Sequence, residues 1–384
     1  MSSNKYLYVV QVSRQLSIDI INRFVKEGKQ IHLLTGLVES NYAALDPSVQ
    51  VTYLNKYDNR TAFKRLFTWG LFTFLSFFYI LFRSKKNDLI LVSTPPFLSF
   101  LGLFFNKIRK QNYHLIIWDL YPDVLVNFGV FKENSRIIKV WKNLNISSFN
   151  RSIHVFTLGR HISESIQKYC EKKPIIIPNW VNTDFVKPIE KTNNSFAIHH
   201  GLTNKLVVMY SGNLGITHNI DSIVSAAEYL THEKDIQFVI IGDGARRAGI
   251  EAMIKEKNLK NILLLPYQDK SILPFSLSSA DIGVVTLGQG AENISVPSKT
   301  YYMLAAGSAI MALSSEQSEL GLLIADYHCG KVFEKPTPQD LSAFIIQLSK
   351  DPELLKQFKL QSRKAALNFT PLNAGLYYQY ICNK

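Results

Sequence analysis

The stretch LVVMYSGNLG, Leu206 to Gly215, decides the fold class of this 384-residue chain. Its apolar, partly β-branched first half is typical of a buried strand, and its two glycines are typical of the loop that follows one. The next segment, Ile220 to Leu230, has the apolar spacing of a helix. Further strand-like runs follow, namely FVIIGDG, ILLLPYQ, DIGVVTLG and AIMALSS. This alternation predicts a parallel sheet with helices on both faces.

The first half of the chain has the same plan, with the strand-like runs YLYVVQ, IHLLTG, VTYL, DLILVS, HLIIW, IHVFTL and PIIIP. Polar residues replace the periodic pattern from Val186 to Lys205, which we interpret as a linker. The sequence therefore predicts an α/β protein with two Rossmann-like, doubly wound domains facing a cleft, at residues 1–190 and 200–365. A helical segment, residues 366–384, is expected to pack back on the first domain. Ligands of such sheets bind outside the carboxyl ends of the strands.

The charge balance indicates an anionic partner, because the chain has 43 lysines and arginines but only 30 aspartates and glutamates, which gives a net charge of +13. The candidates are nucleic acid, anionic lipid and phosphorylated small molecules. We expect no nucleic acid, since zinc-ligand spacing, an aromatic–basic pattern and a compact basic helix are all missing from the sequence. The three cysteines are far apart, which predicts a reducing compartment, no disulfide framework and no metal site. The amino terminus lacks the plan of a signal peptide, so the protein is expected to start in the cytoplasm.

An apolar run of 17 residues, Leu66 to Phe82, interrupts the pattern of the first half and is flanked by basic residues on both sides. It is short for a membrane-spanning helix, which needs about 20 residues. An interfacial helix on anionic lipid, a core helix and a spanning helix all remain open. A second aromatic stretch from Phe97 also ends in a basic cluster. We therefore expect a membrane-facing surface and a peripheral protein at the inner face of the plasma membrane.

Three loops of the second half follow predicted strands and contain glycine: SGNLG from Ser211, GDGARR from Gly242 and GQGAENISVPSK from Gly288. Glycine permits close backbone approach to a ligand, and the helices that follow present free N–H groups to an anion. Together with the basic side chains of Arg246, Arg247 and Lys299, these loops predict a diphosphate site. The alternative is that the glycines only close turns and the basic residues face solvent.

The stretch VPSKTYYMLAAGSAI predicts a short helix from Ser298 to Ala306. Pro297 suits the first helical position and Gly307 suits the position just past the end. Lys299 then lies at the positive end of the helix dipole, which is unfavourable unless an anion is present. A phosphate group would satisfy both charges.

The order of these motifs resembles the family-4 retaining glycosyltransferases of the GT-B fold. The similar segments are LVVMYSGNLGITHNIDSIVSAAEYL, FVIIGDG, NILLLPYQDKSILPFSLSSADIGVVTL and VPSKTYYMLAAG in the second half, and DLILVSTPP, IIWDLYPDVLVNFGVF and IIIPNWVNTDFVKP in the first. Within that family the chain is most similar to bacterial enzymes of the N-acetylfucosamine-transferase type, which build surface polysaccharides on a lipid carrier. The resemblance extends from about Lys5 to Phe369.

The resemblance implies a metal-independent hexosyltransferase without a cofactor, which uses a UDP-sugar as donor substrate. Its acceptor is a polyprenyl-diphosphate-linked saccharide, bound by the first domain at an anionic membrane surface. The second domain is expected to bind the donor. The candidate nucleotide-sugar-binding residues are Gly212, Asn213, Gly215, His218, Gly242, Gly244, Arg246, Arg247, Ser295, Pro297, Ser298, Lys299 and Tyr302.

The chain departs from the family pattern at several of these positions. Asn213 and His218 stand where many members have an arginine and a lysine that bind the diphosphate. The family's paired glutamates should fall near Ile294 and at Tyr302, and neither is Glu. Glu292 lies two residues before the first position and is our candidate for its sugar-binding role through a shifted loop.

The catalytic candidates of the first domain are two carboxylates in WDLYPD, Asp119 and Asp123. Both follow a predicted strand, and Asp119 is the first choice for accepting the proton of an acceptor hydroxyl. The structural alternative is that Asp119 caps the next helix and Asp123 is solvated. Two other functions use the same architecture, a sugar-nucleotide 2-epimerase and a degenerate transferase that acts as a binding or assembly partner. The epimerase would need acidic and histidine motifs that the sequence does not display.

Overall fold

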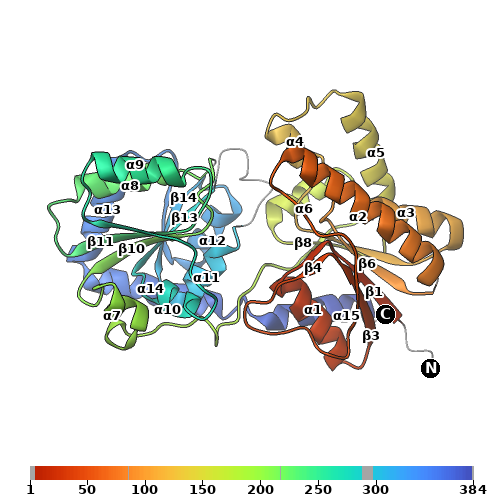
Figure 1. Ribbon diagram of the computed structural model, residues 1–384, viewed down its shortest axis with the longest axis horizontal. Coiled ribbons are helices and arrows are strands. Elements are labelled where there is room, and N and C mark those ends of the chain that lie inside the picture. The colour runs from red at the N-terminus through yellow and green to blue at the C-terminus, as the bar shows by residue number, and fades with distance from the viewer. Residues whose placement is uncertain (1–4, 85, 217, 288–296, 383–384) are drawn as a thin grey trace. The chain divides into compact units, whose positions relative to one another are not determined.

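The computed structural model describes residues 5–84, 86–216, 218–287 and 297–382. These residues form two compact units, each a parallel sheet with helices on both faces (Figure 1). The first unit runs to Asn179 and also contains the residues from Pro371 onward. The second unit contains the described residues between Trp180 and Thr370.

The sheet of the first unit has the strand order β5-β3-β1-β6-β7-β8-β9. Its strands are β1 (Lys5–Val9), β3 (Gln30–Thr35), β5 (Gln50–Tyr53), β6 (Asp88–Val92), β7 (Tyr113–Ile117), β8 (Val155–Thr157) and β9 (Ile175–Ile176), and β2 (Val12–Ser13) pairs separately with β4 (Leu37–Val38). All pairings are parallel, and Val9 lies between Leu34 and Leu91. Because β1 is buried over most of its length, its apolar residues form the centre of this core.

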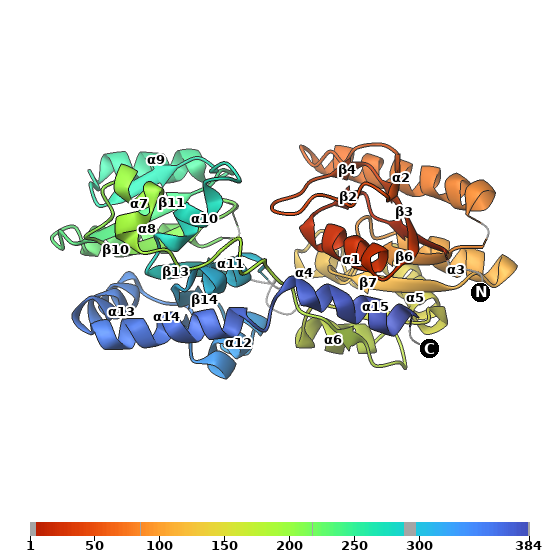
Figure 2. The same cartoon turned by 90° about the horizontal axis from the view of Figure 1, so that it is seen from below.

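The described residues of this unit also form the helices α1 (Gln15–Lys26), α2 (Ala62–Arg83), α3 (Leu98–Arg109), α4 (Asp123–Asn127), α5 (Arg136–Arg151), α6 (Arg160–Gln167) and α15 (Ala374–Cys382). Helix α15 follows the short 3₁₀ turn η2 (Pro371–Asn373) and lies beside α1 (Figures 1 and 2). The rings of Phe24 and Tyr378 meet there edge to face, with their centroids 5.6 Å apart. The last helix of the chain is therefore part of the first unit.

The sheet of the second unit has the strand order β12-β11-β10-β13-β14-β15. Its strands are β10 (Leu206–Ser211), β11 (Ile236–Ile241), β12 (Ile262–Leu265), β13 (Ile282–Thr286), β14 (Ala309–Leu313) and β15 (Gly330–Phe333). In order of appearance this is 3-2-1-4-5-6, the order of the dinucleotide-binding sheets. The chain reverses its winding direction between β10 and β13, so the predicted ligand position is the carboxyl end of these two strands.

The helices of the second unit are α7 (Ser195–His199), α8 (Ile220–Tyr229), α9 (Arg247–Glu256), α10 (Leu273–Ser278), α11 (Lys299–Ala306), α12 (Glu319–Tyr327), α13 (Pro338–Lys350) and α14 (Pro352–Ala366). Apolar residues of α8, α9 and α13 share one core with the sheet (Figure 1). Helix α11 covers the opposite face, where the backbone of Gly283 lies directly under Met303. Helix α14 packs against α11.

The sequence prediction missed structure in two parts of the second unit. The stretch from Val186 to Lys205 is not a plain linker, because it contains the 3₁₀ turn η1 (Lys191–Asn193) and α7. The buried carboxylate of Asp281 fastens this stretch by an ion pair with Lys191, and it also pairs with Lys359 at 2.9 Å. Strand β15 is a second omission, because half of its residues are polar or glycine.

Helix α2 is longer than predicted, with 22 residues instead of 17. By length and composition it could cross a membrane, but only 22% of its most apolar window is buried in the protein. The core-helix alternative is therefore wrong. The inner side of α2 carries Trp69, Phe72, Ser76 and Ile80, which are buried against the unit.

Candidate functional site

The loops after β10 and β11 are joined by backbone hydrogen bonds at the carboxyl end of the second sheet. The N–H of Gly212 donates to Ile241 (2.9 Å), and the N–H of Leu214 donates to Asp243 (2.9 Å). The N–H of Arg246 returns a bond to the Leu214 carbonyl (2.9 Å). Two of the three predicted loops therefore form one continuous surface.

Close packing of these loops accounts for two of the predicted glycines. A Cβ atom on Gly242 would lie 1.9 Å from the carbonyl oxygen of Gly212, and one on Gly244 would lie 2.6 Å from that of Leu214. Both glycines also have positive φ angles, 154° and 150°, which other residues rarely adopt. Loop-to-loop contact requires glycine at both positions even before a ligand is considered.

Lys299 lies over the first of these loops, although it is 89 residues away from it in the sequence. Its Nζ donates a hydrogen bond to the Tyr210 hydroxyl (2.8 Å) and lies 4.2 Å from the centre of the same ring. The Tyr210 hydroxyl in turn donates to the carbonyl of Asn213 (2.7 Å). A Cβ on Gly212 would come within 3.4 Å of the lysine nitrogen. The ammonium group is thus held at the junction of β10, its loop and α11.

Burial lowers the pKa of Lys299 to about 7, because the charged form loses hydration. Among the ion pairs of the described residues, none involves this ammonium group. A buried cation without a counter-charge is unfavourable, and an anionic ligand would supply that charge. The geometry therefore supports the anion that the sequence predicts beside Lys299.

Helix α11 begins at Lys299, one residue later than predicted, and Ser298 is its N-terminal cap residue. The prediction that Pro297 occupies the first helical position is therefore wrong; its carbonyl instead accepts from the N–H of Thr300 (3.0 Å). Gly307 ends the helix with a left-handed φ of 74°, as predicted.

His218 lies close to the same group and is neutral at pH 7. Burial, and after it the positive charge of Lys299, lowers the pKa of this imidazole to about 4. Its Nδ1 is 3.1 Å from the Thr286 hydroxyl at the end of β13. The histidine thus links the two strands at the reversal point and can offer a hydrogen bond, but not a charge, where many family members have a lysine.

The two predicted arginines are both engaged with the chain. Arg246 forms an ion pair with Asp221 in the first turn of α8. The Nη1 atom of Arg247 donates to the carbonyls of Gly242 (2.6 Å) and Leu265 (3.1 Å). These contacts tie the glycine loops to their neighbours, and a role in diphosphate binding stays a prediction for both residues.

Some of the remaining candidate residues of this unit are described by the structure, and others are not. Asn213 is exposed at the tip of the first loop, and a Cβ on Gly215 would lie 2.9 Å from its side-chain nitrogen. Tyr302 is half-buried on α11. Glu292 and Ser295 lie outside the described residues, so the shifted-glutamate hypothesis stays a prediction.

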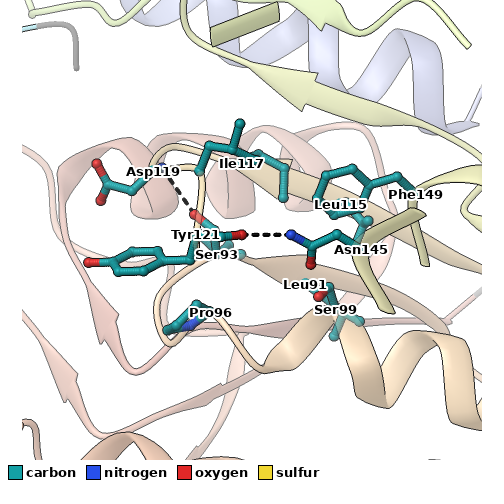
Figure 3. Close-up of a pocket in the computed structure, with 12 residues that line it drawn as sticks. Leu91, Ser93, Pro96, Ser99, Leu115, Ile117, Asp119, Tyr121, Asn145 and Phe149 are labelled. Carbon is teal, nitrogen blue, oxygen red and sulfur yellow. Dashed lines mark hydrogen bonds between the residues drawn. The ribbon is translucent and has the colours of Figure 1, made fainter. Parts of the chain in front are cut away.

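In the first unit, Asp119 follows β7 and is held by its backbone. The Ser93 hydroxyl accepts hydrogen bonds from the N–H groups of Trp118 (3.0 Å) and Asp119 (3.2 Å). Burial raises the pKa of the Asp119 carboxyl group to about 6. Figure 3 shows this carboxylate and the ring of Tyr121 directed to the same side, away from the apolar residues that line the adjacent pocket. Such a carboxylate can accept a proton near neutral pH.

The two structural alternatives for the carboxylates are wrong. Helix α4 has Pro122 as its N-terminal cap residue and no side-chain cap, so Asp119 does not cap it. Asp123 is not simply solvated, because it accepts a hydrogen bond from the Tyr169 hydroxyl (2.5 Å). A bond that fastens α4 in this way gives Asp123 a structural role, and its acid–base role stays a prediction.

Sequence reasoning missed Tyr210, Thr286 and Ser93, which position the candidate groups. Each lies at or just after the carboxyl end of a strand, which is the one signal that could have singled them out. For a metal ion, the described residues contain no cluster of three or more histidine, cysteine, aspartate or glutamate side chains.

Comparison with known proteins supports a class for this fold and site. Residues 192–365, most of the second unit, match the family model described as glycosyl transferases group 1. The chain is 28% identical over 257 residues to the "Probable glycosyltransferase WbjE" of Pseudomonas aeruginosa, covering 65% of this chain and 62% of that protein. It is 26% identical over 269 residues to WcaI of Escherichia coli (strain K12), named for colanic acid biosynthesis, covering 68% and 66%. Each alignment spans less than two thirds of the relative's own length.

Solved structures share the fold over nearly the whole chain. Sucrose-phosphate synthase from Thermosynechococcus elongatus has a TM-score of 0.75 at 14% identity, covering 98% of this chain and 99% of its own. WaaG, a glycosyltransferase involved in lipopolysaccharide biosynthesis, has a TM-score of 0.73 at 12% identity, covering 99% and 100%. Anabaena HepE in complex with UDP and glucose has a TM-score of 0.71 at 10% identity, covering 98% and 99%. The predicted GT-B fold is confirmed, and residues 192–365 are similar to the group 1 glycosyl transferases.

Proposed function

We propose that the chain is a retaining, metal-independent glycosyltransferase of surface polysaccharide assembly. It transfers an N-acetylated hexosamine or deoxyhexosamine from a UDP-sugar to a polyprenyl-diphosphate-linked saccharide. The observation that carries this proposal is the desolvated ammonium group of Lys299, at the point where the second sheet reverses its winding. WbjE is named as a probable glycosyltransferase, the name of WcaI supports a place in polysaccharide assembly, and HepE binds UDP with the same fold.

The chemistry follows from where charge develops during transfer. The acceptor oxygen forms a bond to the anomeric carbon while the bond from that carbon to the donor phosphate breaks, so the electron pair leaves with UDP. Lys299 stabilises the growing negative charge in a site with little water. Neutral His218 adds a hydrogen bond, and Asp119 accepts the proton of the acceptor hydroxyl. No step in this scheme requires a metal ion.

The test is thermal stabilisation of the purified protein by nucleoside diphosphates. A ligand at 100 times its Kd stabilises the native state by about 2.7 kcal/mol, which raises Tm by several degrees. We expect UDP to stabilise the wild type, Lys299→Ala to lose the response, and Lys260→Ala, an exposed lysine of the same unit, to keep it. No response to any nucleotide would overturn the proposal and favour the degenerate binding or assembly partner.

The localisation we propose is peripheral, with α2 lying on the inner face of the plasma membrane. The outer side of α2 carries large apolar side chains at the spacing of one helical face, namely Phe63, Phe67, Phe74, Phe78 and Phe82, and all are exposed. A surface helix normally directs polar residues to water, so the exposed apolar side of α2 departs from this pattern. Exposed apolar residues on α3 (Phe104, Ile108) and α5 (Ile137, Val140, Leu144) extend the same kind of surface.

Hydrogen bonds to both halves of α2 favour an interfacial helix over a spanning one. The side chains of Gln11 and Asn55 both donate to the Thr68 carbonyl (2.9 Å each). Near the other end, Arg109 donates to the carbonyls of Ile80 (2.9 Å) and Leu81 (3.3 Å). A spanning helix would have to break these bonds and remove the buried side of α2 from its unit.

Charge selects anionic lipid as the partner of this surface. Residues 60–151 contain 14 lysines and arginines but only 4 aspartates and glutamates, so most of the net positive charge lies here. Basic residues near an anionic leaflet each contribute about 1 kcal/mol to binding. We expect Phe67→Gln with Phe74→Gln to reduce sedimentation with anionic vesicles by at least tenfold, whereas exposed Leu360→Gln with Leu367→Gln on the second unit leaves it unchanged. Equal binding of both double variants would reject the membrane surface.

A further inference from the structure

Five aromatic side chains form a continuous row across the first unit. The ring centroids of Tyr57 and Trp69 are 6.3 Å apart, and Tyr121 meets Trp69 edge to face at 5.5 Å. Tyr121 stacks on Trp141 at 6.3 Å, and Trp141 lies 5.1 Å from Phe97. The rings come from the β5–α2 loop, α2, the loop after β7, α5 and the residue before α3. We call these five residues the aromatic row.

The aromatic row is not part of the closed core. Trp69 is buried, but the other four side chains are only half-buried and keep part of their surface open to solvent. Core packing would place such rings between apolar neighbours only. Instead, charged groups of opposite sign lie beside the row, and these charges give it the character of a binding surface.

The negative charge is Asp119, which is two residues before Tyr121. Its carboxylate raises the pKa of the Tyr121 hydroxyl after the larger effect of burial, so the two groups are close in space. Among the hydrogen bonds of the described residues, Asp119 donates its backbone N–H to Ser93, and none is donated to its carboxylate oxygens. This leaves the carboxylate available to a ligand hydroxyl.

The positive charge is Arg65, whose guanidinium carbon lies 5.4 Å from the centre of the Trp69 ring. Arg65 forms no ion pair within the described part of the chain, unlike Arg60 in the loop before α2, which pairs with Asp58. Burial raises the pKa of Tyr57, and the charge of Arg65 opposes that effect, so Arg65 also faces the first ring of the row. A cation held over an aromatic face without a carboxylate partner suits an anionic ligand.

We infer that the aromatic row is the subsite for the sugar and diphosphate of the lipid-linked acceptor. This inference rests on the proposed function. A sugar ring has one face of C–H groups, which packs on the exposed parts of Tyr57 and Tyr121, while its hydroxyl groups remain at the edge. An acceptor hydroxyl donates to Asp119, and the carrier diphosphate pairs with Arg65. A bare isoprenoid chain would leave both charges unmet, so the combination favours a saccharide diphosphate.

The position of Trp69 on α2 links this subsite to the proposed membrane surface. Successive residues of a helix are rotated by about 100°, so Phe67 is about 200° from Trp69 and lies on the opposite side of α2. The exposed Phe67 is thus directed away from the unit, whereas Trp69 is buried in it. Arg65 precedes Trp69 by four residues, about one helical turn, and therefore lies on the same side of α2 as Trp69. A diphosphate at Arg65 would therefore be within one helix diameter of the lipid headgroups.

The test separates acceptor binding from donor binding. The probe is farnesyl-diphosphate-linked N-acetylhexosamine, used without vesicles so that membrane binding does not contribute. Arg65→Gln is expected to raise the acceptor KM at least tenfold and Tyr57→Leu at least fivefold, since each removes one direct contact. The matched control is Lys64→Gln, which removes the same charge from the preceding residue of α2 and should change the acceptor KM less than twofold.

Stabilisation by UDP and the KM for the donor should be unchanged in all three variants. Equal acceptor KM values for Arg65→Gln, Lys64→Gln and the wild type would overturn the inference. Binding of sugar-free farnesyl diphosphate as tight as that of the full probe would also overturn it, because stacking of the sugar would then contribute nothing. If the wild type bound the acceptor probe at this subsite but neither bound UDP nor turned over, the proposed function would fail and the subsite would stand.

Discussion

The burial of Lys299 predicts a specific pH dependence for diphosphate binding. Its pKa of about 7 in the free protein means that half of the molecules carry the ammonium charge at pH 7 and about one in a hundred at pH 9. The anion binds the charged form, so the apparent Kd for UDP should rise about 50-fold between pH 7 and pH 9. This change corresponds to about 2 kcal/mol of binding free energy.

The sign follows from proton linkage. The bound anion raises the pKa of Lys299, so the complex holds more protons than the free protein above pH 7. At pH 8 the binding of UDP should take up about 0.9 proton per site. The terminal phosphate of UDP has a pKa of about 6, so at least about nine-tenths of it is charged throughout this range and its contribution is small.

Isothermal titration calorimetry of UDP, in two buffers of different ionisation enthalpy, measures the Kd and the proton uptake together. Lys299→Met should bind weakly, with no pH dependence between pH 7 and pH 9. Lys299→Arg keeps its charge over the whole range and should also be independent of pH. A wild-type Kd that stays constant from pH 7 to pH 9, or a proton uptake near zero at pH 8, would refute the argument that a desolvated Lys299 meets the diphosphate.

Other predictions concern stability and catalysis. Gly242→Ala should lower the free energy of unfolding by about 2 kcal/mol or more in urea titrations, because its Cβ would overlap a carbonyl oxygen, whereas Gly201→Ala, with open space around it, should cost about 1 kcal/mol. Asp281→Ala should cost about 3 kcal/mol in the same titration, since it leaves the buried ammonium of Lys191 unpaired; a loss below 1 kcal/mol would contradict this. Asp119→Asn should reduce kcat at least 100-fold without lowering Tm, and the wild-type kcat/KM should fall below about pH 6 as this carboxyl group is protonated. A pH profile that is flat down to pH 5 would exclude Asp119 as the base.

The sequence by itself determined the fold class, because apolar β-branched strands, helical spacing and glycine turns are local signals. It also located the end of α11 at Gly307, where a left-handed residue is required. It could not locate β15, half of which is polar or glycine, or α7, which has only five residues. Strand β15 depends on its pairing with β14, and the stretch that contains α7 is held by the ion pair of Lys191 with Asp281. Short elements of this kind form because of packing that is distant in the sequence.

The identity of the candidate site was only partly accessible from the sequence. Lys299 stood out because its position conflicts with the helix dipole, which is a local argument. That Arg246 and Arg247 are occupied by Asp221 and backbone carbonyls is visible only in three dimensions. The outward direction of the exposed α2 phenylalanines, such as Phe67 and Phe74, is likewise a property of packing, since the same apolar run would suit a core or a membrane span.

The amino-acid sequence alone determined which residues are apolar, charged or turn-forming, and hence that there are two parallel α/β units. Only the tertiary structure decided that β10 pairs with β13, and this pairing brings Tyr210, His218 and Lys299 together from segments far apart in the chain. Burial and counter-charge set the pKa of a group, and both are created by neighbours that the local sequence does not contain.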